Sequence, residues 1–232
     1  MRRVWSVARI LASLALATSL ACGAAQLPAD ARTTVLSLDH LDCASCGDRL
    51  AARLREQLGV FRVGFDKRSA EMTIVAAPSF DPFPAAKKLA QGETFEILPG
   101  AGRGHYIPWD HTKSAEGADV RAVNLDGSDV PDLASVLAAG KVTVVDFSAI
   151  WCEPCRALDA HMMQTVAEHD DVAYRKLDVG DWDTPIAKHY LGGIPSLPYV
   201  IVFDKGGRKV DTIAGLDLVK LDRAIASSRA KR

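Results

Sequence analysis

Hydrophobic and polar positions alternate along the chain from Thr33 to Asp39, as in a strand with one face buried. Beyond a short loop, leucines recur at helical spacing and Gly59 closes the segment, which predicts an amphipathic helix carrying Leu50, Leu54 and Leu58 on one face. Two more strand patterns, a second helical pattern and a last strand follow at 60–65, 71–76, 82–91 and 94–98.

The later part of the chain has a different pattern. Lys141 to Ser148 is a near-continuous apolar run, typical of a strand buried on both faces of a sheet. A helix with Leu158, Met162 and Val166 on one face comes next. The remaining patterns predict strands at 172–179, 199–203 and 209–214 and a terminal helix at 218–226.

These patterns predict two domains of different class. The region 33–98 has the order β-α-β-β-α-β, the split arrangement of a small α+β, ferredoxin-like domain. The region 119–232 alternates strands and helices, as an α/β domain does. Between them, 99–118 contains four glycines and two prolines and is interpreted as a linker, with His105 and His111 laid over a domain surface. About twenty flexible residues span roughly 25 Å, so sites on the two domains can meet.

Residues 1–21 are interpreted as an export signal rather than as part of the fold. Arg2, Arg3 and Arg9 precede an apolar run that ends at Ala21. As a helix this run is about 18 Å long, too short for a hydrocarbon core of about 30 Å. The run therefore does not predict a permanent membrane-spanning anchor.

The end of this signal, Ser19-Leu20-Ala21-Cys22, resembles the lipobox of bacterial lipoproteins. The resemblance implies that Cys22 carries a lipid and holds the protein to the membrane on the periplasmic side of a bacterial cell envelope. The alternative is an ordinary secretory signal cut near Ala24-Ala25, with Cys22 lost.

Charge excludes one class of partner. The chain has 28 basic and 29 acidic residues, and removing residues 1–21 takes away three arginines, leaving 25 − 29 = −4. Nucleic-acid binding by phosphate neutralisation needs an excess of basic residues. We therefore expect no nucleic-acid partner.

Four of the five cysteines form two CxxC pairs, Cys43 with Cys46 and Cys152 with Cys155. A disulfide closing so short a loop removes little chain entropy, so redox or metal chemistry is favoured over structural cross-links. A single four-cysteine zinc site is disfavoured, because each pair opens its own helical pattern.

The segment Leu41-Asp42-Cys43-Ala44-Ser45-Cys46, followed by a helix and Gly59-Val60, resembles the heavy-metal-associated domain of copper chaperones and metal-pumping ATPases. That resemblance implies that Cys43 and Cys46 bind Cu(I) or another soft metal. Leu41 stands where the family usually has methionine. His40 is a possible third ligand, although an exposed loop histidine is the simpler interpretation. Whether the pair carries metal or electrons, or forms a structural disulfide in a docking module, stays open.

The sequences VVDFSAIWCEPC and LPYVIVFDKGG resemble the thioredoxin fold over about 110 residues. The resemblance implies that Cys152 is an exposed, acidified nucleophile at a helix N-terminus and that Cys155 resolves the mixed disulfide, with no cofactor required. Pro154 stiffens the turn. Glu153 should disfavour the Cys152 thiolate and make the pair more reducing, and the same Glu-Pro dipeptide occurs in exported reductases that serve cytochrome c maturation.

Other positions match the thioredoxin pattern one at a time. Asp146 matches the buried carboxylate that takes the proton of the resolving cysteine, and Lys176 lies where the lysine partner of that carboxylate is expected. Trp151 is expected to border the docking surface. Of two candidates for the cis-proline opposite the cysteines, Pro195 and Pro198, the spacing to the following strand favours Pro198.

The sequence thus predicts an extracytoplasmic thiol:disulfide oxidoreductase, acting as a reductase through Cys152 and Cys155 on protein disulfides or on the thiols of metal sites. Cys43 and Cys46 would bind metal or relay electrons, and a membrane electron donor would re-reduce the protein. The alternative is a copper chaperone whose thioredoxin domain reduces the ligands of the acceptor.

Overall fold

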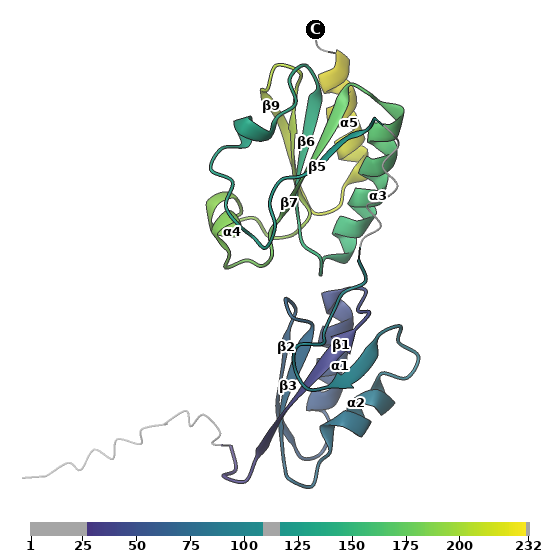
Figure 1. Cartoon of the computed structure of the whole chain (residues 1–232), viewed down its shortest axis with the longest axis vertical. Helices are drawn as coiled ribbons and strands as arrows, with labels where there is room; N and C mark the ends of the chain where they lie inside the picture. Colours follow the sequence, from purple (N-terminus) through teal and green to yellow (C-terminus); the bar gives the residue numbers. More distant parts are fainter. Residues whose placement is uncertain (1–26, 109–116, 231–232) are drawn as a thin grey trace, which may run out of the picture.

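The computed structural model describes residues 27–108 and 117–230. These residues form two bodies, each built around its own sheet, with the helix N-termini that carry the cysteine pairs close to where the bodies meet (Figure 1). The predicted signal segment, Cys22 and His111 lie outside the described residues. Within the described ranges, no helix is long and apolar enough to cross a membrane.

The N-terminal domain contains the predicted split arrangement of strands and helices. Its antiparallel sheet has the order β2-β3-β1-β4. The elements are β1 (Arg32–Asp39), α1 (Ala44–Arg55), β2 (Val60–Asp66), β3 (Glu71–Ala76), α2 (Pro82–Leu89) and β4 (Glu96–Pro99). Helix α1 packs very close to the sheet at Gly47. A Cβ added at this position would come within 2.3 Å of the Phe65 ring, so the packing requires glycine here.

Helix α1 is shorter than the leucine spacing predicts. It ends at Arg55, and the chain then turns with the amide of Val60 donating to the carbonyl of Gln57. Leu50 and Leu54 are buried as expected, but Leu58 lies in the turn and is 98% exposed. The prediction of a three-leucine face was therefore wrong at its last position, because the helix ends before reaching it.

The first half of the predicted linker is packed against the N-terminal domain. The amide of His105 donates to Leu38, the amide of Leu41 donates to His105, and the amide of Ile107 donates to Leu41. Tyr106 is buried between these contacts. Residues 104–107 thus add an edge segment beside the loop that carries the first cysteine pair, which glycine content alone did not indicate.

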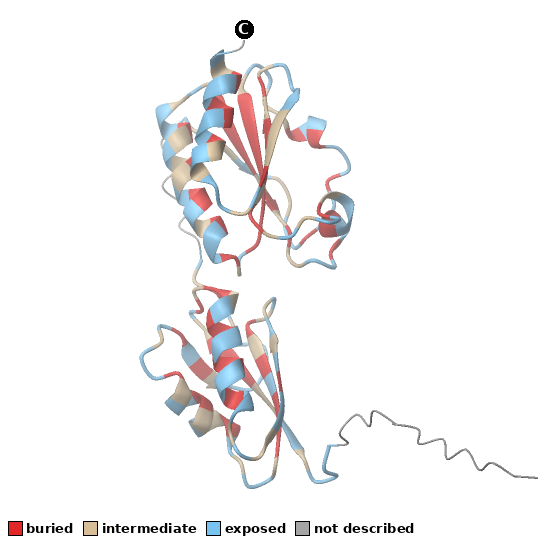
Figure 2. Cartoon of the chain, turned by 180° about the vertical axis from the view of Figure 1, so that it is seen from behind, coloured by how far each residue is buried: buried red, intermediate tan, exposed pale blue. Residues whose placement is uncertain are grey.

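The C-terminal domain has a five-stranded sheet with the order β5-β7-β6-β8-β9. Strands β5, β7 and β6 are parallel, whereas β8 and β9 are antiparallel to their neighbours. The strands are β5 (Asp119–Ala122), β6 (Val142–Ser148), β7 (Val172–Asp178), β8 (Tyr199–Phe203) and β9 (Lys209–Ala214). Every residue of β6 is buried, as its apolar run predicts (Figure 2).

Helices cover both faces of this sheet. Helices α3 (Glu153–Glu168) and α5 (Leu218–Ala230) pack on one face, with Leu158, Met162 and Val166 buried against it. The opposite face is covered by η1 (Leu133–Val136) and α4 (Pro185–Tyr190). These two elements are one to two turns long, too short for hydrophobic periodicity to predict them.

Candidate active site

The second cysteine pair lies where the central strand β6 passes into α3. Cys152 is the N-cap residue of this helix and Cys155 lies in its first turn. Their sulfur atoms form a disulfide of 2.02 Å, and the amide of Cys155 donates to Cys152 Sγ at 3.2 Å. Pro154 occupies an early helical position, where a missing amide hydrogen costs no helical bond. The local sequence therefore places Cys152 at the positive end of the α3 dipole.

Cys152 was predicted to be exposed, but only 4% of its surface is accessible. It packs in the apolar cluster under α4 and η1, which also contains Leu197. Its two neighbours in sequence, Trp151 and Glu153, both contact the N-terminal domain. The expectation of exposure was wrong because Cys152 packs into the apolar cluster of its own domain, beside two residues that contact the N-terminal domain.

The cis-proline of the C-terminal domain is Pro198. The Leu197–Pro198 peptide bond is cis, and no other cis bond is present in the described ranges. The spacing argument, which chose Pro198 over Pro195, is confirmed on this point. Pro198 directly precedes β8, the neighbour of β6 in the sheet.

Asp146 is a fully buried carboxylate on β6. Its Oδ2 accepts a hydrogen bond from the Tyr174 hydroxyl at 2.8 Å, and within the described residues no hydrogen bond reaches its Oδ1. Burial raises the pKa of Asp146 to about 7, with Asp159 adding to the increase and the Tyr174 hydrogen bond and Lys176 opposing it. A carboxyl group that titrates near neutral pH is suited to exchanging protons with a thiol.

Lys176 pairs with a residue that the sequence did not indicate. Its Nζ lies 2.6 Å from Oδ1 of Asp159, a residue of α3, and both side chains are largely buried. Lys176 also acts on Asp146 as a nearby positive charge that lowers its pKa, and the Tyr174 hydroxyl donates a hydrogen bond to the same carboxylate. Sequence reasoning missed Tyr174 and Asp159. Asp159 could have been found as the one acidic residue on the otherwise apolar face of α3.

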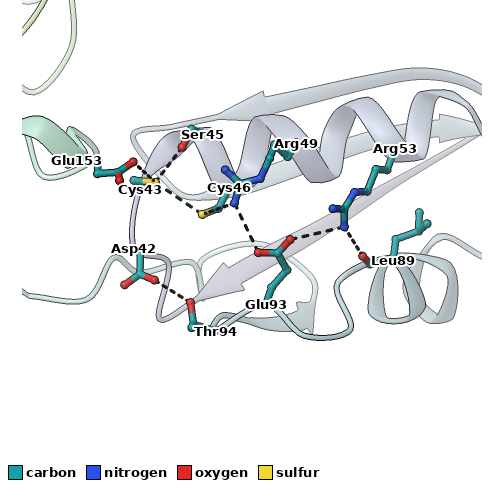
Figure 3. Close-up of polar contacts among 10 residues, drawn as sticks. All are labelled: Asp42, Cys43, Ser45, Cys46, Arg49, Arg53, Leu89, Glu93, Thr94 and Glu153. Carbon is teal, nitrogen blue, oxygen red and sulfur yellow. Dashed lines mark hydrogen bonds and ion pairs between the residues drawn. The ribbon is translucent and has the colours of Figure 1, made fainter.

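The first cysteine pair repeats this placement at α1. Cys43 is the N-cap residue of the helix and Cys46 lies in its first turn. Their sulfur atoms are 3.6 Å apart and do not form a disulfide (Figure 3). Cys43 Sγ also lies 3.0 Å from the Ser45 hydroxyl, and Arg49 donates to Cys46 Sγ at 3.1 Å. Both thiols are buried.

Opposing effects act on the pKa of the Cys46 thiol. Burial raises the pKa of the Cys46 thiol, the neighbouring Cys43 adds to this, and Arg49 opposes it by favouring the thiolate. Glu93 Oε2 lies 3.6 Å from Arg49 and offsets part of its charge. Arg49 and Glu93 were not predicted; the helical spacing from Cys46 to Arg49 was the available signal for the first.

Tyr106, from the segment taken for a linker, is a further unpredicted residue near the first pair. Its hydroxyl is buried and has no hydrogen-bond partner among the described residues. Burial, and then the charge of Cys43, raises the pKa of Tyr106. His40, the possible third metal ligand, instead contacts Asp39 at 3.2 Å and its side chain is 67% exposed. No group of three or more His, Cys, Asp or Glu suited to a metal occurs within the described ranges.

Comparison with known proteins identifies the C-terminal domain. The family model for thioredoxin matches residues 130–227. A thioredoxin from Malassezia sympodialis is 37% identical over 97 residues, covering 41% of this chain and 89% of the relative. Thioredoxin-2 from Saccharomyces cerevisiae is 35% identical over 95 residues, covering 40% of this chain and 88% of the relative. The chain belongs to the thioredoxin family.

A solved structure of the Malassezia sympodialis thioredoxin is 28% identical to this chain and covers 49% of it and 93% of that structure, with a TM-score of 0.38. Membership of the thioredoxin family makes the protein a thiol:disulfide oxidoreductase, and thioredoxin chemistry needs no cofactor because both sulfur atoms that react belong to the protein. The predicted α/β class of the C-terminal domain, with a small antiparallel α+β domain before it, is confirmed.

The thioredoxin motif contacts the first cysteine pair directly. The amide of Ala44 donates to the carbonyl of Trp151 at 3.1 Å, and Cys43 Sγ donates to Glu153 Oε2 at 3.4 Å (Figure 3). Ala44 directly follows Cys43, and Trp151 directly precedes Cys152. The hydrogen bond between them therefore places the two CxxC motifs next to each other. Glu153, predicted to act on Cys152, makes its closest described contact with the thiol of the other domain.

Proposed function

We propose that the protein is a thioredoxin-family reductase in which the Cys152–Cys155 pair exchanges electrons with the Cys43–Cys46 pair. The observation that carries this proposal is the backbone contact between Ala44 and Trp151, which aligns the two CxxC motifs beside each other. The contact between Cys43 Sγ and Glu153 makes Cys43 the member of its pair that faces the thioredoxin motif.

The transfer balances as two consecutive exchanges. Cys152 thiolate attacks Cys43 Sγ of an oxidised first pair, and Cys46 leaves as a thiolate that the Arg49 guanidinium stabilises. Cys155 gives its proton to Asp146 and attacks Cys152, which releases Cys43 thiolate. The second pair loses two electrons and the first pair gains them. The protons of Cys152 and Cys155 pass to solvent, the latter through Asp146, and the Cys43 and Cys46 thiolates take up two protons from solvent.

Trapping the mixed disulfide tests this relay in the full chain. The variant Cys46→Ser/Cys155→Ser keeps Cys43 and Cys152, and mild oxidation should link them in more than half of the monomer, as read by peptide mass spectrometry. The matched control, Cys43→Ser/Cys155→Ser, keeps Cys46 and Cys152 and should cross-link several-fold less. Equal cross-linking in both variants, or only concentration-dependent dimers, would refute the relay.

We further propose that the protein is exported, is tethered through lipid on Cys22, and is re-reduced by a membrane electron donor. The support is the charged and apolar pattern of residues 1–21 and the lipobox-like sequence at Cys22. Expression of the full chain with labelled fatty acid should give a labelled membrane-associated product, and Cys22→Ser should give an unlabelled one. A wild-type product that stays unlabelled contradicts the lipid proposal while leaving the relay untouched.

The second candidate function is copper handling by the N-terminal domain, whose Cys-x-x-Cys sequence resembles heavy-metal-associated domains. Two reduced sulfur atoms 3.6 Å apart at a helix N-terminus suit a soft ion of low coordination number. Titration of the reduced full chain with Cu(I) against a competing chelator distinguishes the two candidates. Tight one-to-one binding that Cys43→Ser abolishes, without any electron exchange between the pairs, favours copper handling.

A further inference from the structure

The loop after β7 presents two carboxylates beside the thioredoxin motif. Asp181 and Asp183 flank Trp182, whose ring lies 6.5 Å from that of Trp151. Trp151 is held in place by its Nε1, which donates to the carbonyl of Gly180 at 2.7 Å. We call the set Trp151, Asp181, Trp182 and Asp183 the acidic rim. It combines two negative charges with aromatic faces, the features that bind a lysine or arginine side chain.

In this structure the acidic rim is occupied by a basic turn of the same chain. Lys67 lies in the turn between β2 and β3, with its Nζ 2.8 Å from Asp181 Oδ1 and 4.2 Å from the centre of the Trp151 ring. Arg68, the next residue, lies 3.8 Å from Asp183. The ion pair between Lys67 and Asp181 is the stronger one, because both of these side chains are less than one-third exposed. In the other ion pair, Asp183 is 76% exposed.

The turn that presents Lys67 is fixed before it docks. The amide of Arg68 donates to the Asp66 carboxylate at 2.9 Å. The backbone of Gly104 lies so close to the other end of the turn that an added Cβ would come within 2.3 Å of the Ser69 carbonyl oxygen. A preformed turn loses little conformational entropy when it docks. Little of the favourable energy of its ion pairs is therefore offset by the cost of ordering the turn.

We propose that the acidic rim is the recognition surface for proteins that carry lysine or arginine beside a reducible disulfide. The turn containing Lys67 and Arg68 is its intramolecular occupant, and an external substrate must displace it to reach Cys152. The proposal names a substrate class for the thioredoxin domain and does not depend on electron transfer to Cys43. In the reaction, the substrate disulfide gains two electrons and two protons as Cys152 and Cys155 form their disulfide.

The test uses two synthetic disulfide peptides that differ only in the residues flanking the cysteines, lysine in one and glutamate in the other. Single-turnover oxidation of the pre-reduced thioredoxin pair is followed in a Cys43→Ser/Cys46→Ser background, so that only one pair reacts. Lys67→Gln/Arg68→Gln empties the rim and should speed reaction with the lysine peptide about fivefold. Lys87→Gln/Lys88→Gln, which removes two charges from α2, is the matched control and should change nothing.

Removal of the carboxylates completes the experiment. In the emptied protein the lysine peptide should react about tenfold faster than the glutamate peptide, and this preference should shrink in 0.5 M salt. Asp181→Asn/Asp183→Asn in the same background should bring the ratio close to one, with unfolding midpoints recorded for every variant. Equal rates for the two peptides in the emptied protein, or a preference that survives loss of both carboxylates, would overturn the proposal.

Discussion

The two cysteine pairs have the same local structure and different surroundings. Each begins with an N-cap cysteine and places the second cysteine in the first helical turn. Near the second pair, Asp146 is buried on the central strand and its raised pKa allows proton exchange near neutral pH. Near the first pair, burial raises the pKa of the Cys46 thiol, and Arg49, which donates to Cys46 Sγ, offsets part of this increase.

The CxxC sequence therefore determines where the two sulfur atoms lie on the helix. Residues elsewhere in the fold determine how readily the thiols gain and lose protons. A buried carboxyl suits a pair that must lose and regain protons as its disulfide opens and closes. A guanidinium suits a pair that must hold negative sulfur, either as a leaving thiolate or as a metal ligand.

The largest effect is expected from removing the nucleophile. Cys152→Ser should abolish reduction of an external protein disulfide, a loss of at least about a thousandfold, because it removes the N-cap sulfur that attacks the substrate and leaves only the resolving Cys155. Cys43→Ser should retain most of that activity. The measurement is the rate of disulfide reduction by the full chain with excess dithiothreitol, and equal losses in the two variants would show that the pairs are not distinct.

The next effect concerns stability and pH. Because the pKa of Asp146 is about 7 in the folded protein and near 4 when unfolded, the folded state binds the proton more tightly and stability falls as pH rises from 4 to 7. Asp146→Asn should therefore stabilise the protein at pH 8, by up to about 4 kcal/mol, and lose this advantage near pH 4.

Denaturant unfolding at both pH values measures the Asp146 effect, and Asp119 provides a control of opposite sign. Arg175 and Lys141 lower the pKa of Asp119, so Asp119→Asn should destabilise at neutral pH and matter less in acid. A pH-independent effect of Asp146→Asn would contradict the assigned titration.

A smaller effect is expected at the first pair. Arg49→Gln removes the group that lowers the pKa of Cys46, so alkylation of Cys46 at pH 8 should slow about threefold. Mass spectrometry of the labelled peptides gives the rate for each cysteine. Arg53→Gln, which removes the other arginine paired with Glu93, is the control, and a similar slowing there would assign the effect to general charge.

The smallest effect is expected at the contact between the pairs. Glu153→Gln replaces the carboxylate that accepts a hydrogen bond from Cys43 Sγ with a weaker, neutral acceptor, and alkylation of Cys43 should become about twofold faster because its sulfur is held less tightly in this contact. Cys46 in the same molecules serves as the internal control. An unchanged or slower reaction of Cys43 would show that this contact does not restrain its sulfur.

Most of the fold could be predicted because its elements are long and periodic. Strand β3 (Glu71–Ala76) and strands β8 and β9 have the bounds that the sequence predicts, and the apolar face of α3 is buried as expected. The failures have local causes. Leu58 continues the helical spacing after the helix has ended, and periodicity cannot detect a turn made by backbone hydrogen bonds.

The candidate site was predictable where its residues stand at a recognisable spacing from a motif or a strand. The two CxxC motifs and Pro198 could be found from spacing. The ion pair between Lys176 and Asp159 and the hydrogen bond from Tyr174 to Asp146 depend on how α3 packs on the sheet. The burial of Cys152 in the apolar cluster of its own domain and the contact between Glu153 and Cys43 depend on tertiary packing, which spacing along the sequence does not show.

The edge segment that ends at Ile107 has a consequence for competition between partners. Its hydrogen bond to Leu41 anchors the chain beside the first pair, and Arg156 of α3 donates to the carbonyl of Ile107 at 2.8 Å. In the sequence, eleven residues lie between Ile107 and Asp119, the first residue of β5. A short connection gives each domain an effective concentration of about a millimolar or more at the other, so an external substrate must bind tightly or be abundant to reach Cys152.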